Sequence, residues 1–231
     1  MTNTFPFTPA IWSYGIAAII FLAFAARMLL GWRGGARATV LFVAVIASAA
    51  WAGLVWVALG STSIRWWRIA TTIDSFRVGT WLIFMTLLLE SWRNDSHGRS
   101  LLKGAAGYLA VPLLLLISGT LIGSTPPWAE ASSGNDNQLT FYVWLGASVF
   151  GLALTEQLYR RSPPNRRWAI KPLVIGLAGM FALDLLIYSG AVLLHHVDPA
   201  MWAARGIACA VVIFFVGVAT ARNTTWTVAR A

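Results

Sequence analysis

The feature that most constrains this chain is a series of apolar runs of about twenty residues, the length of helix that spans the hydrocarbon core of a bilayer. Charged residues make up only 11% of the chain. Soluble domains carry roughly 25% charged residues. The sequence therefore predicts an all-α, polytopic membrane protein.

We expect seven transmembrane helices in one domain that covers residues 1–231. Short connections join them, and none is long enough to form a separate domain. The predicted spans are Trp12–Leu30, Thr39–Leu59, Thr71–Ser91, Leu101–Ile122, Leu139–Leu158, Ile170–Leu194 and Met201–Ala221.

Basic residues are distributed unevenly between the connections. Those after the first, third and fifth predicted spans and the C-terminal tail carry Arg33, Arg37, Arg93, Arg99, Lys103, Arg160, Arg161, Arg166, Arg167, Lys171, Arg222 and Arg230. Seven crossings put all of these on one side, so the positive-inside rule predicts an outside N-terminus and a cytoplasmic C-terminus. The net charge of +9 is then explained by basic residues at the cytoplasmic membrane surface, and we expect no nucleic-acid partner.

The densest group of charges lies in the stretch EQLYRRSPPNRRWAIKP, which begins at Glu156. We expect a turn at Ser-Pro-Pro-Asn, with basic residues that anchor a cytoplasmic loop and bind anionic lipid headgroups. These residues are Arg160, Arg161, Arg166, Arg167 and Lys171. Glu156 and Arg160 are one helical turn apart, which predicts an interfacial salt bridge.

Asp184 lies near the middle of the predicted sixth span. A charged side chain there costs about 3 kcal/mol on insertion scales, so it is expected to face the bundle interior and to have a partner. Tyr188 is one helical turn further on and could donate its hydroxyl. Arg205, about one turn into the next span, is the other candidate partner.

Asp74 and Arg77 form an i, i+3 pair at the start of the predicted third span. For this pair and for Asp184, two interpretations remain open. Either these groups form a polar cluster that senses a proton or a ligand, or they are clamps that only fix the packing of the helices.

Catalytic and cofactor motifs are missing from the sequence. It contains no Gly-rich phosphate loop, no H-E-x-x-H, no G-x-S-x-G and no paired cysteines. The last predicted span has no lysine that could form a Schiff base with retinal. His195, His196 and Asp198 do not have the spacing of a recognised metal site, and a solvated loop is the favoured interpretation. We therefore expect no catalytic residue, no metal and no cofactor.

Tryptophans occur at or near several predicted span ends, where an indole ring prefers the membrane interface. They are Trp12, Trp32, Trp92, Trp128, Trp168 and Trp202. Trp66 and Trp67 lie between Arg65 and Arg68, either in a short amphipathic segment on the outer surface or at the end of a helix. The end of a helix is the favoured interpretation.

Three stretches with polar residues among apolar ones resemble a known family. EQLYRRSPPNRRWAIKPL, GLAGMFALDLLIYSGAVL and DPAMWAARG are similar to the membrane-embedded N-terminal region of the PrsK-type sensor histidine kinases of bacterial XrtA/PEP-CTERM exosortase systems. The opening WSYGIAAIIFLAFAARMLLGWRGG resembles the start of the same region. Residues 60–138 match only in hydropathy.

The resemblance implies a membrane-embedded input domain of a two-component system in the bacterial inner membrane. Its partners would be a cytoplasmic kinase module and a response regulator, and a homodimer is implied because sensor kinases work as dimers. Members of the family continue into a GAF-like module and a kinase, which do not occur in residues 1–231. We therefore expect this chain to hold the sensor part, either as a piece of a longer kinase or as a stand-alone relative.

Two other classes of function remain open. A small membrane transporter or channel subunit would use Asp184 on a proton or ion path. A lipid-modifying enzyme of the membrane ranks below it, because the sequence offers no catalytic constellation for it.

Overall fold

The structure, a computed structural model, describes residues 7–31, 34–61, 63–97, 138–194 and 197–222. Long apolar runs interrupted by few polar residues fold here as long helices. The helices are α1 (Phe7–Leu30), α2 (Ala36–Leu59), α3 (Ile64–His97), α6 (Gln138–Arg161), α7 (Pro164–Leu194) and α8 (Pro199–Arg222).

The prediction of seven transmembrane helices is wrong. The described residues form six helices, of which five are long and apolar enough to cross a membrane: Thr8–Leu30, Ala36–Leu59, Ile64–Glu90, Arg166–Leu194 and Pro199–Arg222. These five make the chain a multi-pass membrane protein.

Two of the predicted spans account for the difference. Leu101–Ile122 lies outside the described residues. Leu139–Leu158 falls within α6, which is not among the five apolar helices. Thr140 lies near the start of α6, and Glu156 and Gln157 precede its last turn. These polar residues shorten the uniformly apolar part of the helix.

Most of the other helices extend beyond the predicted spans. The largest difference is in α3, which begins at Ile64 instead of Thr71 and continues to His97. Trp66 and Trp67 therefore lie in the first turn of a long helix, as the favoured interpretation predicts. Periodicity of apolar residues does not reveal these ends, because they carry arginine, serine and asparagine.

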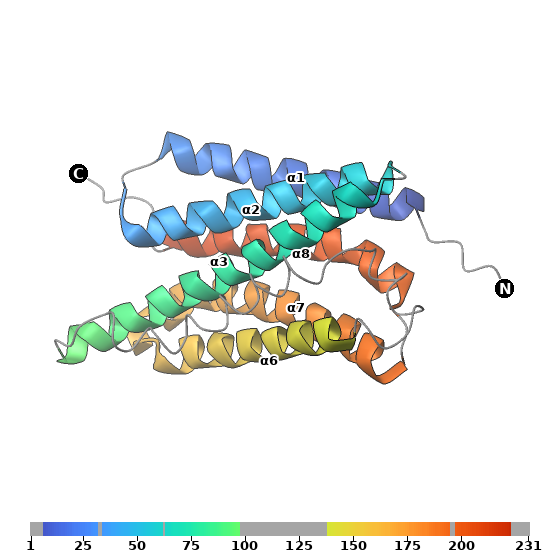
Figure 1. The fold of residues 1–231 in the computed structure, drawn as a ribbon. Coiled ribbons are helices and arrows are strands. Elements are labelled where there is room, and N and C mark those ends of the chain that lie inside the picture. Colours follow the sequence, from blue (N-terminus) through green and yellow to red (C-terminus); the bar gives the residue numbers. More distant parts are fainter. Residues whose placement is uncertain (1–6, 32–33, 62, 98–137, 195–196, 223–231) are drawn as a thin grey trace.

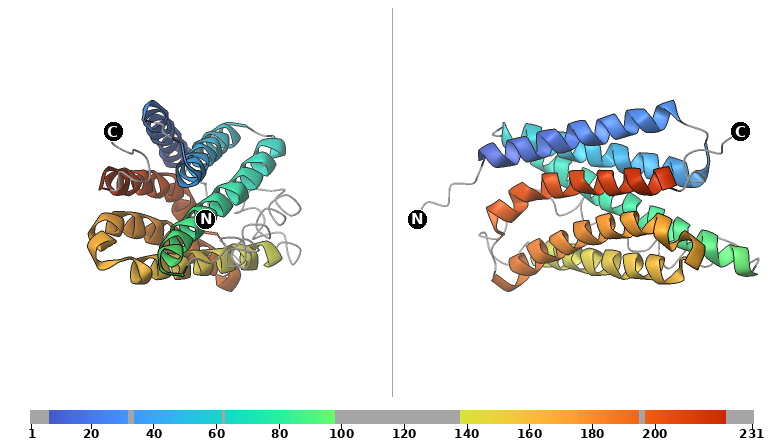
Figure 2. Two further views of the ribbon diagram at one scale, coloured as in Figure 1. Left: turned by 90° about the vertical axis from the view of Figure 1, so that its left-hand side faces the viewer. Right: turned by 180° about the vertical axis from the view of Figure 1, so that it is seen from behind.

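The six helices pack in a ring (Figures 1 and 2). Each helix packs against two others, in the order α1, α2, α3, α6, α7, α8 and back to α1. α3 runs obliquely across the bundle, so it reaches from the α1–α2 pair to α6. This arrangement turns one face of α3, α7 and α8 towards a shared interior.

The ends of α1, α3, α6 and α8 and the starts of α2 and α7 lie at the same end of the bundle. We call this the basic end, because its described helix termini carry Arg27, Arg37, Arg160, Arg161, Arg166, Arg167, Lys171 and Arg222. The helix arrangement therefore brings together basic residues from separate parts of the sequence.

Between α6 and α7, the turn is shorter than predicted. Only Ser162 and Pro163 separate the two helices, because Pro164 starts α7. Proline suits the first position of a helix, where the backbone N–H would have no partner within the helix. Arg167 Nε donates to the Ser162 carbonyl oxygen at 3.2 Å, which closes the turn.

Close helix packing depends on small residues, as is common in membranes. Gly151 of α6 faces the Phe181 ring of α7, where an added Cβ would lie 2.5 Å from ring carbons. Gly206 of α8 lies against Ser13 of α1, whose hydroxyl oxygen accepts a hydrogen bond from the Ile207 backbone N–H at 2.8 Å. The α6–α7 and α1–α8 contacts therefore leave little room for a residue larger than glycine at these two positions.

Pro172 lies inside α7 and leaves one backbone acceptor without its helical donor. That acceptor is the carbonyl oxygen of Trp168, four residues earlier. Arg222 of α8 donates to it from Nη1 at 3.2 Å, and its guanidinium carbon lies 3.8 Å from the centre of the Trp168 ring. The arginine from the neighbouring helix thus replaces the donor that proline lacks.

Replacing Pro172 with alanine is expected to make Arg222 less important for stability, because the new N–H can donate to the Trp168 carbonyl. In a double-mutant cycle, Arg222→Gln should lower the free energy of unfolding less in the Pro172→Ala background, by about 0.5 kcal/mol or more. Thermal unfolding in lipid nanodiscs measures the four proteins. Arg166→Gln, another exposed arginine at the basic end, is the control, and purely additive effects of the first pair would contradict the coupling.

Candidate functional site

Four charged residues from three helices meet in the interior of the ring. Asp74 and Arg77 come from α3, Asp184 from α7 and Arg205 from α8. We call these four residues the ion cluster. Their side chains are between 0% and 5% exposed, which would be costly for any of them alone.

Arg205 bridges two carboxylates on different helices. Its Nε and Nη2 donate to the two oxygens of Asp184, at 2.7 and 3.2 Å, in a bidentate pair. Its Nη1 donates to Oδ2 of Asp74 at 2.6 Å. One guanidinium group of α8 therefore holds α7 and α3 at the same time.

Arg77 completes the pairing of Asp74. Arg77 Nε donates to Asp74 Oδ1 at 2.8 Å, and Nη2 of the same guanidinium lies 2.7 Å from that oxygen. Arg77 Nη1 faces two sulfur atoms, Met180 Sδ at 3.5 Å and Cys209 Sγ at 3.6 Å. Two arginines and two carboxylates balance in charge, which reduces the cost of burying the ion cluster.

Aromatic rings surround the two guanidinium groups. The centre of the Trp51 ring of α2 lies 4.2 Å from the guanidinium carbon of Arg77 and 5.0 Å from that of Arg205. The ring centres of Trp202 and Tyr188 lie 5.0 and 5.8 Å from the guanidinium carbon of Arg205. Ring faces at these distances attract cations, and more strongly where water is excluded.

The aromatic rings extend the site to the remaining helices. Tyr14 of α1 packs edge-on against Trp51 with ring centres 5.3 Å apart, and its hydroxyl donates to the Trp202 carbonyl oxygen at 2.9 Å. Trp144 of α6 stacks on Tyr188 with ring centres 5.6 Å apart. Each of the six described helices thus contributes to the ion cluster or to its aromatic surroundings.

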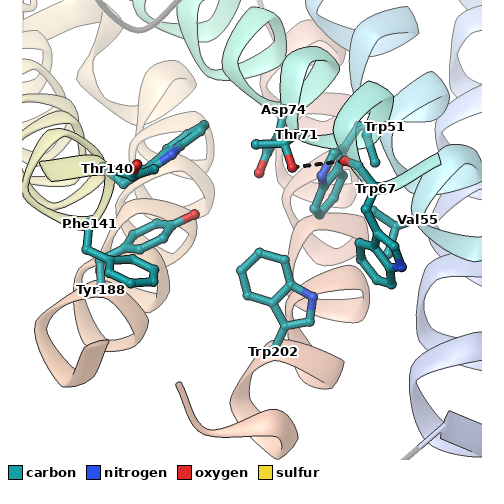
Figure 3. A pocket seen from close by; sticks show the side chains of 11 residues that line it. Trp51, Val55, Trp67, Thr71, Asp74, Thr140, Phe141, Tyr188 and Trp202 are labelled. Atoms are coloured by element: carbon teal, nitrogen blue, oxygen red, sulfur yellow. Dashed lines mark hydrogen bonds between the residues drawn. The ribbon is translucent and has the colours of Figure 1, made fainter. Parts of the chain in front are cut away.

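A cavity of about 30 Å³ lies beside the ion cluster (Figure 3). Asp74 lines it together with the hydroxyl-bearing residues Thr71 and Thr140. Most of its other lining residues are aromatic: Trp51, Trp67, Phe141, Trp144, Tyr188 and Trp202. The cavity therefore touches the charged centre on one side and α6 on the other.

Both predicted contacts within the ion cluster are present. Asp184 pairs with Arg205, and Asp74 pairs with Arg77. From the sequence we predict two separate ion pairs, whereas in the structure the contact between Arg205 and Asp74 joins the two pairs into one cluster. Among the hydrogen bonds of the described residues there is none between the Tyr188 hydroxyl and Asp184, and Tyr188 instead presents its ring to Arg205.

The sequence predicts the positions of the tryptophans less accurately than those of the charged residues. Trp202 is predicted at the membrane interface but is buried in the aromatic surroundings of Arg205. Trp51 and Trp67 are also buried and line the cavity. The position of Trp51 in the middle of a predicted span, away from either interface, is the one signal that could have indicated an interior role.

The residues of the predicted basic loop lie away from the ion cluster, at the basic end. The predicted salt bridge is present, with Arg160 Nη2 2.8 Å from Glu156 Oε1, but both side chains are more than half exposed. Such a pair contributes little to stability. Lys171 and Arg166 are also exposed on the first turns of α7.

The histidines of the proposed solvated loop, His195 and His196, lie outside the described residues. Asp198 belongs to the described part and its carboxylate accepts a hydrogen bond from the Ala200 N–H at 2.7 Å, near the start of α8. Within the ranges described, no three histidine, cysteine, aspartate or glutamate side chains gather as a metal site would require.

Comparison with known proteins adds no relative. The chain matches no family model, no curated protein and no solved structure. Its function is therefore inferred from the ion cluster and its surroundings and from the family resemblance of the sequence.

Chemically, the ion cluster is suited to holding helices in a defined arrangement. Both carboxylates already accept hydrogen bonds from arginine, and the guanidinium groups cannot release their protons. A movement of α3, α7 or α8 would have to exchange one charge pair for another. Such exchanges favour discrete arrangements over continuous sliding.

Proposed function

We propose that this chain is a membrane-embedded input domain of a two-component sensor histidine kinase in a bacterial inner membrane. It would pass a signal to a cytoplasmic kinase module and, through that module, to a response regulator. The resemblance of residues 156–205 to PrsK-type kinases supports the class. The observation that carries the mechanism is that Arg205 of α8 holds α3 through Asp74 and α7 through Asp184.

The mechanism follows from this shared arginine. In one arrangement Arg205 pairs with both carboxylates, as described above. In a second arrangement α3 moves relative to α7 and α8, and Arg205 keeps only Asp184. A stimulus that binds one arrangement more tightly shifts the population towards it, and α8 carries the change to the basic end.

Lipids and a second copy of the chain are the remaining partners in this proposal. The exposed basic residues at the start of α7 and the end of α6 would face anionic headgroups and hold those helix ends at the membrane surface. A dimer would place two input domains above one kinase dimer.

A chimera tests the proposal. The chain is joined in frame to the cytoplasmic domains of a histidine kinase that lacks its own sensor, and phosphorylation of the cognate regulator is measured in membranes. Asp184→Asn removes one charge of the pair with little change in shape. We expect it to change basal phosphorylation about tenfold, which corresponds to about 1.4 kcal/mol between the two arrangements.

Glu156→Gln is the matched control, because it breaks an ion pair of the same type at an exposed position. Its phosphorylation should equal that of the unmodified chimera. If Asp184→Asn and Asp74→Asn both leave phosphorylation unchanged at equal membrane abundance, the ion cluster is not the signalling element.

The transporter alternative is favoured by one observation, the presence of two buried carboxylates at membrane depth. Against it, both carboxylates are paired with arginine. Proton or ion uptake by proteoliposomes that contain the purified chain, lost in Asp184→Asn, would support transport over signalling.

A further inference from the structure

The cavity beside the ion cluster contains a polar group without a partner. Thr140 is 5% exposed and lines the cavity, and its hydroxyl oxygen has no hydrogen-bond partner among the described residues. Thr71, on the opposite wall, is different, because its hydroxyl donates to the Trp67 carbonyl oxygen at 3.0 Å (Figure 3). A buried hydroxyl left alone costs about 1–3 kcal/mol, so the unpaired Thr140 indicates an occupant.

Two further groups at the cavity can accept or donate a hydrogen bond. The Tyr188 hydroxyl has no hydrogen bond within the described part of the chain, and its residue lines the cavity. Asp74 also lines it. Its carboxylate accepts one hydrogen bond from Arg77 Nε and one from Arg205 Nη1, and Arg77 Nη2 forms an ion pair with the same carboxylate. A carboxylate offers about four acceptor positions, so it has capacity for a donor in the cavity.

Charge excludes an ion as the occupant. The aromatic faces that would attract a cation already face the guanidinium groups of Arg77 and Arg205. The carboxylates are balanced by these two arginines, so a further cation would have no opposite charge. An anion would lie against Asp74 and the negative faces of indole rings. The occupant is therefore neutral.

Size decides between neutral occupants. The cavity of about 30 Å³ exceeds the roughly 10–15 Å³ that a cavity needs to hold one water, and it is far below the roughly 300–1,000 Å³ of a small-molecule pocket. Buried waters typically make about three hydrogen bonds, and the cavity offers Thr140, Tyr188 and Asp74. Because apolar cavities stay empty whereas polar ones fill, these three groups favour water.

We propose that ordered water occupies this cavity and that one water molecule hydrogen-bonds to Thr140 of α6, Tyr188 of α7 and Asp74 of α3. It would connect α6 to the ion cluster, which the described side chains of α6 do not reach by a direct hydrogen bond. This inference does not depend on the signalling role proposed above.

The first test is a crystal structure of the purified chain grown in a lipid phase, at a resolution that shows ordered water. One peak within hydrogen-bond distance of the Thr140 hydroxyl is expected, and it should be lost in Thr140→Val, which keeps the shape of the side chain. An empty cavity, density for a larger molecule, or a peak that persists unchanged in Thr140→Val would overturn the proposal.

Thermal unfolding in nanodiscs is a second, independent test, in which the direction of the change in unfolding temperature caused by Thr140→Val decides. If water satisfies the hydroxyl, Thr140→Val removes a hydrogen bond and lowers the unfolding temperature. If the cavity is dry, the same change removes an unpaired polar group and raises the unfolding temperature or leaves it unchanged, which contradicts the proposal.

Thr155→Val is the matched control for the crystallographic test. Thr155 lies on the same helix and is also buried, but its hydroxyl donates to the Gly151 carbonyl oxygen at 2.7 Å and it does not line this cavity. The water peak near Thr140 should therefore remain in Thr155→Val.

Discussion

Arg205→Leu is expected to leave little folded protein in the membrane. The change removes the only cation that pairs with Asp184 among the described ion pairs and leaves that carboxylate buried and uncompensated. Removing one partner of a buried ion pair typically costs about 3–5 kcal/mol. We expect the unfolding temperature in nanodiscs, followed by tryptophan fluorescence, to fall by more than in any other single substitution proposed for this chain.

A charge-neutral double variant separates charge from packing. Arg205→Leu combined with Asp184→Leu removes both members of the bidentate pair and leaves Asp74 with Arg77. It should recover much of the lost stability, since an apolar replacement of a buried ion pair is often tolerated. Equal unfolding temperatures for the single and double variants would contradict this account, as would a stable Arg205→Leu.

The exposed Arg160 gives the control for this series. Its side chain is 75% exposed and it pairs with Glu156, so Arg160→Leu should change stability by about 1 kcal/mol or less. A large effect there would mean that the membrane environment, not burial within the bundle, sets the strength of these pairs.

Gly206→Ala is expected to separate α1 from α8. The added Cβ would lie 2.6 Å from the Ser13 hydroxyl oxygen, and 2.9 and 3.0 Å from the Ser13 carbonyl carbon and oxygen. A side chain can rotate away, but helix backbone cannot, so the two helices must shift. Such overpacking costs about 1–3 kcal/mol, and the shift also weakens the hydrogen bond from the Ile207 N–H to the Ser13 hydroxyl.

Gly179→Ala of α7 is the control for this prediction. Beyond the nearby backbone of its own helix, no atom lies within 4 Å of a Cβ added there, and alanine is favoured over glycine inside a helix by about 1 kcal/mol. Thermal unfolding should therefore show a lower temperature for Gly206→Ala and an equal or higher one for Gly179→Ala. The same shift in both variants would mean that helix propensity, not the contact with Ser13, controls the outcome.

The sequence predicts the helices well because apolar runs of membrane length have few alternatives. It predicts their ends poorly: the first turns of α3 and α7 carry arginines, and the helix continues through them. The count of seven spans failed at two places. Leu101–Ile122 lies outside the described residues, and α6 carries Thr140 near its start and Glu156 and Gln157 near its end and is not among the five apolar helices.

For the candidate site, local spacing predicts only local contacts. The i, i+3 pair of Asp74 and Arg77 follows from helix geometry, and Asp184 near the middle of a span requires some partner. The contact between Arg205 and Asp74 joins residues 131 positions apart. That contact depends on how α3 crosses the bundle, which the pattern of one helix cannot show. The cavity and its unpaired hydroxyl depend on the same crossing.

The hydrogen bond from Arg222 to the Trp168 carbonyl has a mechanical consequence. It ties the last turn of α8 to the first turns of α7, while Arg205 ties an earlier turn of α8 to Asp184 of α7. Two attachments far apart along one helix resist both sliding and rotation. α7 and α8 are therefore expected to move together as one rigid body, and any change of arrangement is expected in their contacts with α1, α3 and α6.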